Sequence, residues 1–434
     1  QELQGAFDLS QAPLFRASLL RVGEREHGLV LSMHHIISDG WSLGVIMREL
    51  ASLYGAFSRG QDASLAPLPV QYADYALWQR TWFEGAALER QLAYWKSQLD
   101  GAPASLELPT DRPRPALPSY RGAARFFTLS RPLSEALEHL AKKEGVTLFM
   151  VLLAAYQVVL SRWSGQSDVM VGTPMAGRTH RQTEGLVGFF VNTLALRARL
   201  GDVKDFRELL AQVKETALSA YAHQDLPFEK LVQELAPSRD LSRQAIFQVW
   251  FVLHRMASET PDMPGLQLDS ISGDHVTAKF DLALILEETD DGLRGGVEYA
   301  TDLFDESTIA RFTAHLSGLL EQVVTAPEAP LAQLELLGAD ERQCLLLDWN
   351  ATAADYPLDR CMHELFEAQV LATPDAVALV YGETALSYGQ LERRANQLAQ
   401  HLRAGGVGPE SVVALCVPRS PDMVVGVLGI LKAG

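Results

Sequence analysis

The apolar pattern of the chain changes period near Gly40. Leu29–Met33 is a short apolar run with the length of a strand, and His34 and His35 lie at its carboxyl end. From Trp41 to Phe57, apolar residues recur at the three- and four-residue spacing of a helix. The pattern therefore predicts a strand–loop–helix junction. The first backbone N–H groups of such a helix have no partner within it, which suits a reactive or anionic group nearby.

A proline-rich stretch separates this junction from a long run of predicted elements. Five prolines fall between Pro103 and Pro118, a composition typical of an extended, semi-rigid connection between two lobes. Before it, a helix is predicted at Ala86–Leu99. After it, apolar periodicity predicts strands at Ala124–Leu129, Asp168–Gly172, Phe190–Arg197, Ile246–Leu253, Leu282–Glu287 and Gly295–Tyr299. It also predicts helices at Leu133–Lys143, Leu148–Trp163, Phe206–Ala222, Pro227–Leu235 and Ser307–Val324. This mixture predicts an α/β lobe of about 200 residues.

A second linker-like stretch, rich in Ala, Asp and Pro, covers residues 327–357. Beyond it the pattern predicts two strands, Ala376–Val380 and Ser411–Val417. A helix is predicted after each strand, at Tyr388–Arg403 and Asp422–Leu431. This βαβα order is typical of the opening of an α/β domain.

Composition and charge exclude several classes of function. The formal net charge is −17, and nucleic-acid binding is not expected because contact with the phosphate backbone needs a basic surface. The longest apolar runs, Leu148–Leu160 and Val424–Leu431, are too short to span a bilayer. The three cysteines have no metal-like spacing and indicate no disulfide framework. We therefore expect a cytoplasmic protein that does not bind membranes.

The most specific chemical feature is the string His34-His35-Ile36-Ile37-Ser38-Asp39-Gly40. On a strand the two histidines would face opposite ways, so that one points into a cleft while the other packs. Neutral imidazole accepts a proton near pH 7, which makes either a candidate general base. Gly40 allows backbone conformations that other residues resist. No metal is expected, because adjacent strand residues cannot both reach one ion. A bare pair of histidines is more often ordinary than catalytic, so the pair alone does not decide the function.

The longer string from His34 to Ser42, HHIISDGWS, resembles the HHxxxDG core of the condensation domains of non-ribosomal peptide synthetases. Further strings are similar to that family's motifs and follow in its order. They are Tyr72–Gln79, Gly172–Arg178 with Gly188–Thr193, His223–Leu231, and Asp240–Arg243 with Phe247 and Gln248. Five ordered motifs are hard to obtain by chance. The resemblance covers residues 1–325.

A second resemblance covers residues 360–434. Leu386–Leu391 and Leu431–Gly434 are similar to the first two core motifs of adenylation domains. We therefore expect the C-terminal part of a condensation first lobe at 1–110, a second lobe at 111–325, a linker at 326–360 and the N-terminal part of an adenylation domain at 361–434. The family's patterns also imply that both domains are truncated. A fragment of this kind is expected to be inactive by itself.

The resemblance implies an α/β (α+β) fold of two chloramphenicol-acetyltransferase-like lobes in a V, with a tunnel between them. A donor acyl-thioester and an acceptor aminoacyl-thioester would enter from opposite sides, and the acceptor amine would attack the donor carbonyl. His35 is the expected catalytic residue, either as a base or as a group that positions the amine. His34 and Gly40 are expected to support the motif.

The resemblance also implies roles for residues around the histidines. An ion pair between Asp39 and Arg178 is expected to hold the loop, because an Arg–carboxylate pair has a rigid geometry. The alternative is that Asp39 only caps the loop. Ser38, Trp41 and Asn192 are expected to line the tunnel, although Asn192 could equally satisfy a strand. The string from Ser38 to Ser42 looks more like the subtype that joins two L-residues than the subtype that follows an epimerase.

No cofactor is expected in the condensation part. The substrates would be the phosphopantetheine arms of upstream (donor) and downstream (acceptor) carrier domains, beside an adjoining adenylation domain. ATP and Mg²⁺ would serve only a complete adenylation domain.

A coenzyme A-dependent acyltransferase would lack the adenylation motifs, and an epimerisation domain is not normally followed by them. A non-catalytic recruitment module of the same fold would be expected to lose His35 or Asp39, and both are present.

Overall fold

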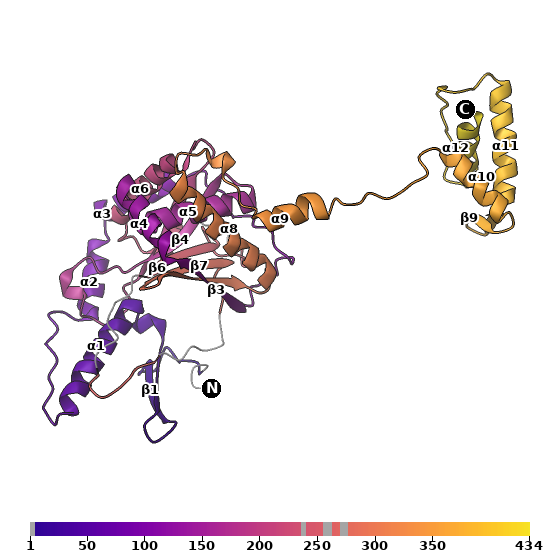
Figure 1. Cartoon of the computed structure of the whole chain (residues 1–434). Coiled ribbons are helices and arrows are strands. Elements are labelled where there is room, and N and C mark those ends of the chain that lie inside the picture. Colours follow the sequence, from indigo (N-terminus) through magenta and orange to yellow (C-terminus); the bar gives the residue numbers. More distant parts are fainter. Residues whose placement is uncertain (1–4, 236–239, 255–262, 270–276) are drawn as a thin grey trace. The chain divides into compact units, whose positions relative to one another are not determined.

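The computed structural model describes residues 5–235, 240–254, 263–269 and 277–434. The chain divides into two compact units, residues 1–343 and 344–434 (Figure 1). The histidine string lies in the first unit, and the sequence with adenylation-like motifs lies in the second. The segment predicted as a linker, 326–360, is therefore divided between the two units.

A six-stranded sheet forms the centre of the first unit, in the order β3-β8-β7-β6-β4-β5. The strands are β3 Gly122–Ser130, β4 Asp168–Met175, β5 Asn192–Arg199, β6 Val249–His254, β7 Leu282–Thr289 and β8 Gly292–Ala300. β6 runs parallel to β4 and β7, and the other neighbours are antiparallel. The six strands predicted for this region are confirmed with small shifts at their ends. The mixed α/β class is confirmed with them.

Helices pack on this sheet, and Figure 1 shows α4, α5, α6 and α8 on the same side of it. They span α4 Arg131–Glu144, α5 Leu148–Ser164, α6 Phe206–Ala222 and α8 Glu306–Thr325, with the shorter α7 at Phe228–Leu235. Every residue of α5 from Met150 to Leu160 is buried, as expected for a helix that is apolar on all sides. Thr147 caps its start, and Gly165 ends it in the left-handed conformation.

The histidine string follows a two-stranded antiparallel hairpin of β1 Phe15–Arg21 and β2 His27–Met33. Helix α1, Gly40–Phe57, comes after the string, as the sequence predicts. Helix α2, Tyr72–Trp82, was not predicted. Its aromatic residues Tyr72, Tyr75, Trp78 and Trp82 recur at helical spacing, a signal that the prediction did not use. Its start is a capping box in which Asp74 accepts a hydrogen bond from the backbone N–H of Gln71 at 2.8 Å.

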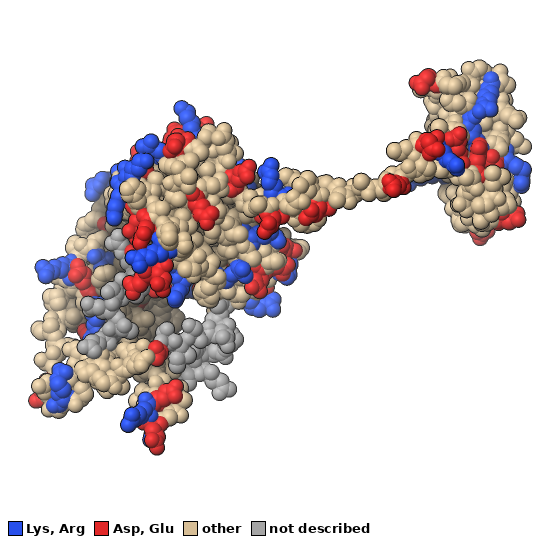
Figure 2. All heavy atoms as spheres, in the orientation of Figure 1, with Lys and Arg blue, Asp and Glu red and all other residues tan. Residues whose placement is uncertain are grey.

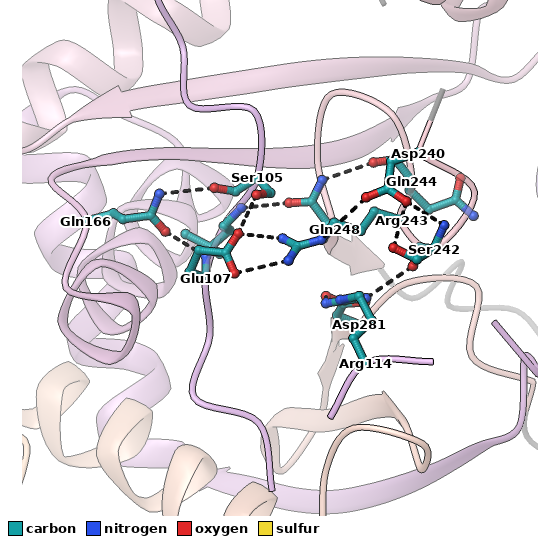
Figure 3. Close-up of polar contacts among 11 residues, drawn as sticks. Ser105, Glu107, Arg114, Gln166, Asp240, Ser242, Arg243, Gln244, Gln248 and Asp281 are labelled. Atoms are coloured by element: carbon teal, nitrogen blue, oxygen red, sulfur yellow. Dashed lines mark hydrogen bonds and ion pairs between the residues drawn. The ribbon is translucent and has the colours of Figure 1, made fainter. Parts of the chain in front are cut away.

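Helix α3, Ala86–Leu99, and the proline-rich connection pack with the six-stranded sheet. Trp95 is 1% exposed, and it shares a buried cluster with Leu106 and the residues of the sheet. Polar contacts hold the connection as well (Figure 3). Glu107 forms two bonds to Arg243, of 2.6 and 3.1 Å, and the side chain of Gln248 accepts a bond from the N–H of Leu106 at 2.8 Å. Residues before the predicted boundary at 110 therefore belong to this core.

The first half of the predicted linker packs on the first unit. Leu331 and Leu334 are buried, and a short helix, α9 Ala339–Gln343, follows. Glu341 lies 2.7 Å from His315 Nε2, and His315 Nδ1 accepts a hydrogen bond from Trp163 at 3.0 Å.

After a short π-helix at Cys344–Asp348, the second unit consists of three α-helices and a hairpin: α10 Met362–Ala372, β9 Val377–Tyr381, β10 Thr384–Ser387, α11 Tyr388–Ala404 and α12 Pro421–Ala433. Lys432 of α12 is only 5% exposed. Its ammonium pairs with Glu367 of α10 and lies 2.8 Å from Glu392 of α11. A buried charge is tolerated only when it is paired, so Lys432 joins the three helices.

The predicted strand at Ser411–Val417 is wrong. A strand needs a hydrogen-bonded neighbour, and no described segment pairs with these residues. The only partner of β9 within the described residues is β10, which forms an antiparallel hairpin with it. In place of the predicted βαβα order, the second unit therefore has a helix, a hairpin and two further helices.

Among the described residues, no single helix has the length and apolar character needed to cross a membrane, and α4 and α5 meet that test only as a pair bent by 104°. Figure 2 shows basic side chains interspersed with acidic ones on the face drawn. Ion pairs such as Arg131–Glu135 join exposed neighbours on helix α4.

Candidate active site

The two histidines lie in a short turn and not on the strand that precedes them. β2 ends at Met33, and His34 caps a single 3₁₀ turn, His35–Ile37. His34 Nδ1 accepts a hydrogen bond from the backbone N–H of Ile36 at 3.1 Å, as a capping side chain does. The prediction that the histidines face opposite sides of a strand is therefore wrong, because this cap ends the extended conformation.

Hydrogen bonds place the ring protons of the two histidines on opposite nitrogens. His35 Nδ1 lies 2.6 Å from the carbonyl oxygen of Ser38, and a carbonyl can only accept, so Nδ1 carries the proton. His34 Nδ1 is itself an acceptor, so its neutral ring carries the proton on Nε2. Neutral His35 therefore offers the lone pair of Nε2, which has no hydrogen-bond partner among the described residues. The side chain of His35 is exposed.

Asp39 caps the start of α1 and holds a buried carboxylate. Oδ1 accepts hydrogen bonds from the backbone N–H and the hydroxyl of Ser42, at 2.8 and 2.7 Å, and Oδ2 accepts one from the N–H of Phe190 at 3.0 Å. Burial by itself would raise the pKa of Asp39. The bonds from Ser42 and Phe190 and the charge of Arg178 outweigh that burial, so the pKa is lowered. The carboxylate therefore stays ionised.

Arg178, from the segment after β4, pairs with this carboxylate. Its Nη2 lies 3.2 Å from Asp39 Oδ1, and the two side chains are 1% and 3% exposed. Nη1 donates to the carbonyls of Thr183 and Leu186, and the guanidinium lies 4.1 Å from the centre of the Phe190 ring. We call residues 34–39 the histidine loop. The Asp39–Arg178 pair joins this loop to a segment far along the sequence.

Residues 184–190, which we call the bridging segment, contact the histidine loop through their backbone. Trp41 Nε1 donates to the carbonyl of Glu184 at 2.9 Å. The hydroxyl of Ser42 accepts from the N–H of Gly188 at 3.1 Å and lies 2.9 Å from its carbonyl oxygen. Ser42 is fully buried. These contacts fix the bridging segment against the first turn of α1.

Helix α2 holds the same segment from another side. The hydroxyl of Tyr72 donates to the carbonyl of Phe189 at 2.9 Å, and its ring packs against Phe190. A Cβ at Gly188 would lie 2.3 Å from Tyr72 Cδ2. Glycine is therefore needed at position 188 for this close approach.

The residues expected to line a tunnel are largely engaged in local contacts. The side-chain amide of Asn192 uses all its bonds on four backbone groups: the carbonyls of Gln224 and Leu226 and the N–H groups of Thr193 and Phe228. It has none left for a substrate. Ser38 is buried and holds His35, whereas Trp41 is 46% exposed.

Gly40 is the first residue of α1, and a Cβ placed there would meet nothing within 4 Å. The structure therefore gives no steric reason for glycine at this position.

No cluster of three or more metal-ligand side chains occurs in the described part of the chain. A hollow of about 1510 Å³ lies beside α3 and α7, and no residue from His34 to Ser42 lines it.

Sequence reasoning gave no role to Ser42, Tyr72, Gly188 or Phe189. In the sequence, these four residues are distinguished only because they lie within segments that resemble condensation-domain motifs. Hydrogen bonds to the backbone of a distant segment leave no periodic pattern in a single sequence, so these contacts appear only in the structure.

Comparisons with known proteins show two families along the chain. The family described as Condensation domain matches residues 1–346, and the family described as AMP-binding enzyme matches residues 366–434. One of the linear gramicidin synthase proteins of Brevibacillus parabrevis is 47% identical over the whole chain, which spans 6% of that protein. Malpinin synthetase of Mortierella alpina is also 47% identical over the whole chain, again 6% of its length.

Solved structures show the same fold. A four-domain non-ribosomal peptide synthetase, holo-AB3403 bound to AMP and glycine, matches 93% of this chain and 31% of its own with a TM-score of 0.79 and 26% identity. The X-domain from teicoplanin biosynthesis is 31% identical, with a TM-score of 0.72 and 77% coverage of both chains. The chain therefore belongs to the condensation-domain family found in non-ribosomal peptide synthetases, and it continues into the first part of an AMP-binding domain.

Proposed function

We propose that residues 1–346 are the condensation centre of a longer synthetase that forms peptide bonds between carrier-bound substrates. The observation that carries the proposal is the state of His35. Its Nδ1 is bound to the carbonyl of Ser38, so its Nε2 lone pair is left to accept a hydrogen bond from an attacking amine.

The reaction needs only this one acceptor from the histidine. The acceptor amine forms a bond to the donor carbonyl carbon, the carbon–sulfur bond breaks, and the donor arm leaves as a thiolate. One proton leaves the amine and one is taken up by the thiolate, so no oxidant or further reactant is required. His35 Nε2 receives the amine's hydrogen bond during the attack.

Placement of the amine is expected to supply much of the rate. An α-amino group has a pKa of about 8, so a fair fraction of it is already unprotonated near neutral pH. Orientation of two reactants can supply about 7–11 kcal/mol at best. The Asp39–Arg178 pair and the bridging segment support this role, because they hold the loop that carries His35.

The proposed partners are carrier domains, one delivering the donor thioester and one the acceptor, each on a phosphopantetheine arm. Amino-acid activation with ATP and Mg²⁺ would belong to the complete AMP-binding domain and not to residues 1–346. We also propose a cytoplasmic location, which the three free cysteines support: Cys344, Cys361 and Cys416.

The test uses the longer synthetase that contains these residues. Donor and acceptor carriers are loaded with L-aminoacyl groups, and dipeptidyl-thioester formation is followed by mass spectrometry. We expect product with an L-donor, much less with a D-donor, and none when the acceptor carrier is left unloaded. Absence of product with verified loading would overturn the proposal.

A recruitment module is the second candidate, because the chain also resembles an X-domain, which one structure shows in complex with OxyB. The intact His35 and Asp39 favour catalysis. If no dipeptide forms with verified loading, the recruitment function becomes the better account, and binding of a partner enzyme would then be measured.

A further inference from the structure

The ring of Phe189 lies against the imidazole of His35. The ring centroids are 5.2 Å apart and the planes meet at 85°, which is a T-shaped contact. Phe189 is 36% exposed, whereas Gly188 and Phe190 on either side of it are buried. The ring of Phe189 is therefore partly exposed, although its two neighbours in the sequence are buried. Phe189 lies about 150 residues after His35 in the chain.

The backbone on both sides of Phe189 is fixed by residues from the N-terminal part of the chain. Ser42 Oγ holds the N–H of Gly188 at 3.1 Å, and Asp39 Oδ2 holds the N–H of Phe190 at 3.0 Å. The hydroxyl of Tyr72 holds the carbonyl of Phe189 itself at 2.9 Å. With the peptide groups around Phe189 held in this way, the direction of its Cα–Cβ bond is fixed.

Within the described structure, the imidazole of His35 is otherwise held by one hydrogen bond, from Nδ1 to the Ser38 carbonyl at 2.6 Å. A single bond at one edge fixes that nitrogen but leaves the ring free to swing about its χ angles. A second contact on the ring removes this freedom. Phe189 is the aromatic side chain that supplies such a contact among the described residues.

We propose that Phe189 is a positioning residue for condensation: its ring holds the His35 imidazole so that Nε2 faces the acceptor amine. This deepens the proposed function and rests on it. Phe189 need not touch the reacting atoms. The bridging segment thereby joins the Asp39–Arg178 pair to the His35 ring, because Phe190 bonds to Asp39 and Phe189 contacts His35.

The test is a double-mutant cycle of Phe189→Ala and His35→Ala in the longer synthetase. Single-turnover formation of dipeptidyl thioester is measured across acceptor concentrations. Because misplacement by about 1 Å can cost on the order of 100-fold, we expect Phe189→Ala to lower the maximal rate by about 10- to 100-fold with little change in half-saturation. In the His35→Ala background the further loss should be under about twofold, because the residue acts through His35.

Two comparisons separate positioning from general damage. Phe189→Leu, which keeps bulk without the ring, should recover part of the rate. Phe126→Ala is the matched control, since Phe126 is 75% exposed on the edge strand β3, and it should leave the rate unchanged. Equal losses from Phe189→Ala in both His35 backgrounds would overturn the proposal.

A spectroscopic measurement tests the positioning role even if the wild-type protein makes no product. Nitrogen-15 spectra of the histidine-labelled chain report which ring nitrogen of His35 carries the proton. The same spectra, with carbon-13 labelling of the ring, also report the orientation and mobility of the His35 imidazole. We expect Nδ1 to stay protonated in both proteins, because the bond to Ser38 is untouched, with one ring orientation in the wild type and averaging among several in Phe189→Ala. A single unchanged orientation in Phe189→Ala would overturn the positioning role, whereas averaging with no wild-type product would overturn only the proposed function.

Discussion

Asp39 joins the histidine loop to helix α1, to Arg178 and to the bridging segment. Its carboxylate is 3% exposed, accepts hydrogen bonds from Ser42 and Phe190, and faces the guanidinium of Arg178. Each of these partners stabilises the ionised form. The string HHxxxDG could identify Asp39 and its pairing with Arg178 as an expectation. The N–H of Phe190, which bonds to Asp39, and the N–H of Gly188, which bonds to Ser42, could not be read from the sequence, because backbone N–H groups are the same in every residue but proline.

We expect Asp39→Asn to destabilise the first unit by about 3–5 kcal/mol near neutral pH, because it leaves Arg178 buried without its counter-ion. Urea unfolding followed by tryptophan fluorescence measures this difference. Glu135→Gln, in an exposed pair with Arg131, should leave stability nearly unchanged.

The same carboxylate predicts a pH dependence. The folded-state pKa of Asp39 is lowered, so its contribution to stability is fully present above the unfolded pKa of about 3.9 and is lost as pH falls through the lower folded value. The difference between wild type and Asp39→Asn should therefore shrink in that acidic window. A difference that stays constant across it would contradict this account of the carboxylate.

At the scale of elements, helices with clear periodicity were predicted closely. α3 and α6 begin and end where the sequence predicts, at Ala86–Leu99 and Phe206–Ala222. Helix α2 was not predicted, although Tyr72, Tyr75, Trp78 and Trp82 follow the spacing of one helix face. The strand predicted at 411–417 is wrong, because an apolar run shows that a segment can be a strand, but only a partner makes it one. The bridging segment has no regular structure, and its place depends on contacts with distant residues.

The turn that leads toward the bridging segment should not tolerate a side chain at Gly177. This residue has φ of +63°, and a Cβ would lie 1.9 Å from the carbonyl oxygen of Phe190. Gly177→Ala should cost at least about 1–2 kcal/mol from the left-handed backbone alone. Gly318→Ala is the control, because nothing lies within 4 Å of its Cβ in α8, and it should stabilise by about 0.5–1 kcal/mol. Thermal unfolding of the two variants tests this contrast, and similar shifts would contradict it.

At the scale of the whole molecule, the proline-rich connection behaves as part of the six-stranded lobe. Composition predicts its extended form but not the surface that it covers, because the partners Gln166, Arg243, Gln248 and Asp281 lie far along the chain (Figure 3). The same holds for residues 326–343, which carry a linker-like composition yet pack on the first unit. The division into two families along the chain, by contrast, followed from ordered motifs.

Trp95 tests whether α3 belongs to this lobe. It is 1% exposed, and its Nε1 donates to the carbonyl of His223 at 3.0 Å. Trp95→Ala should destabilise the lobe by about 3–5 kcal/mol, seen as faster hydrogen exchange in α5 and β4. Trp349→Ala, at a position 69% exposed, should leave that exchange unchanged. Faster exchange confined to α3 would show that the helix is not part of the core.

The most direct test of the central claim is the single-turnover rate of peptide-bond formation for His35→Ala against wild type in the longer synthetase, with verified carrier loading. A histidine whose Nε2 receives the attacking amine should contribute about 10²- to 10⁴-fold, and the variant should lose that factor while remaining folded. A variant rate within about twofold of wild type would contradict the claim that His35 takes part in the chemistry.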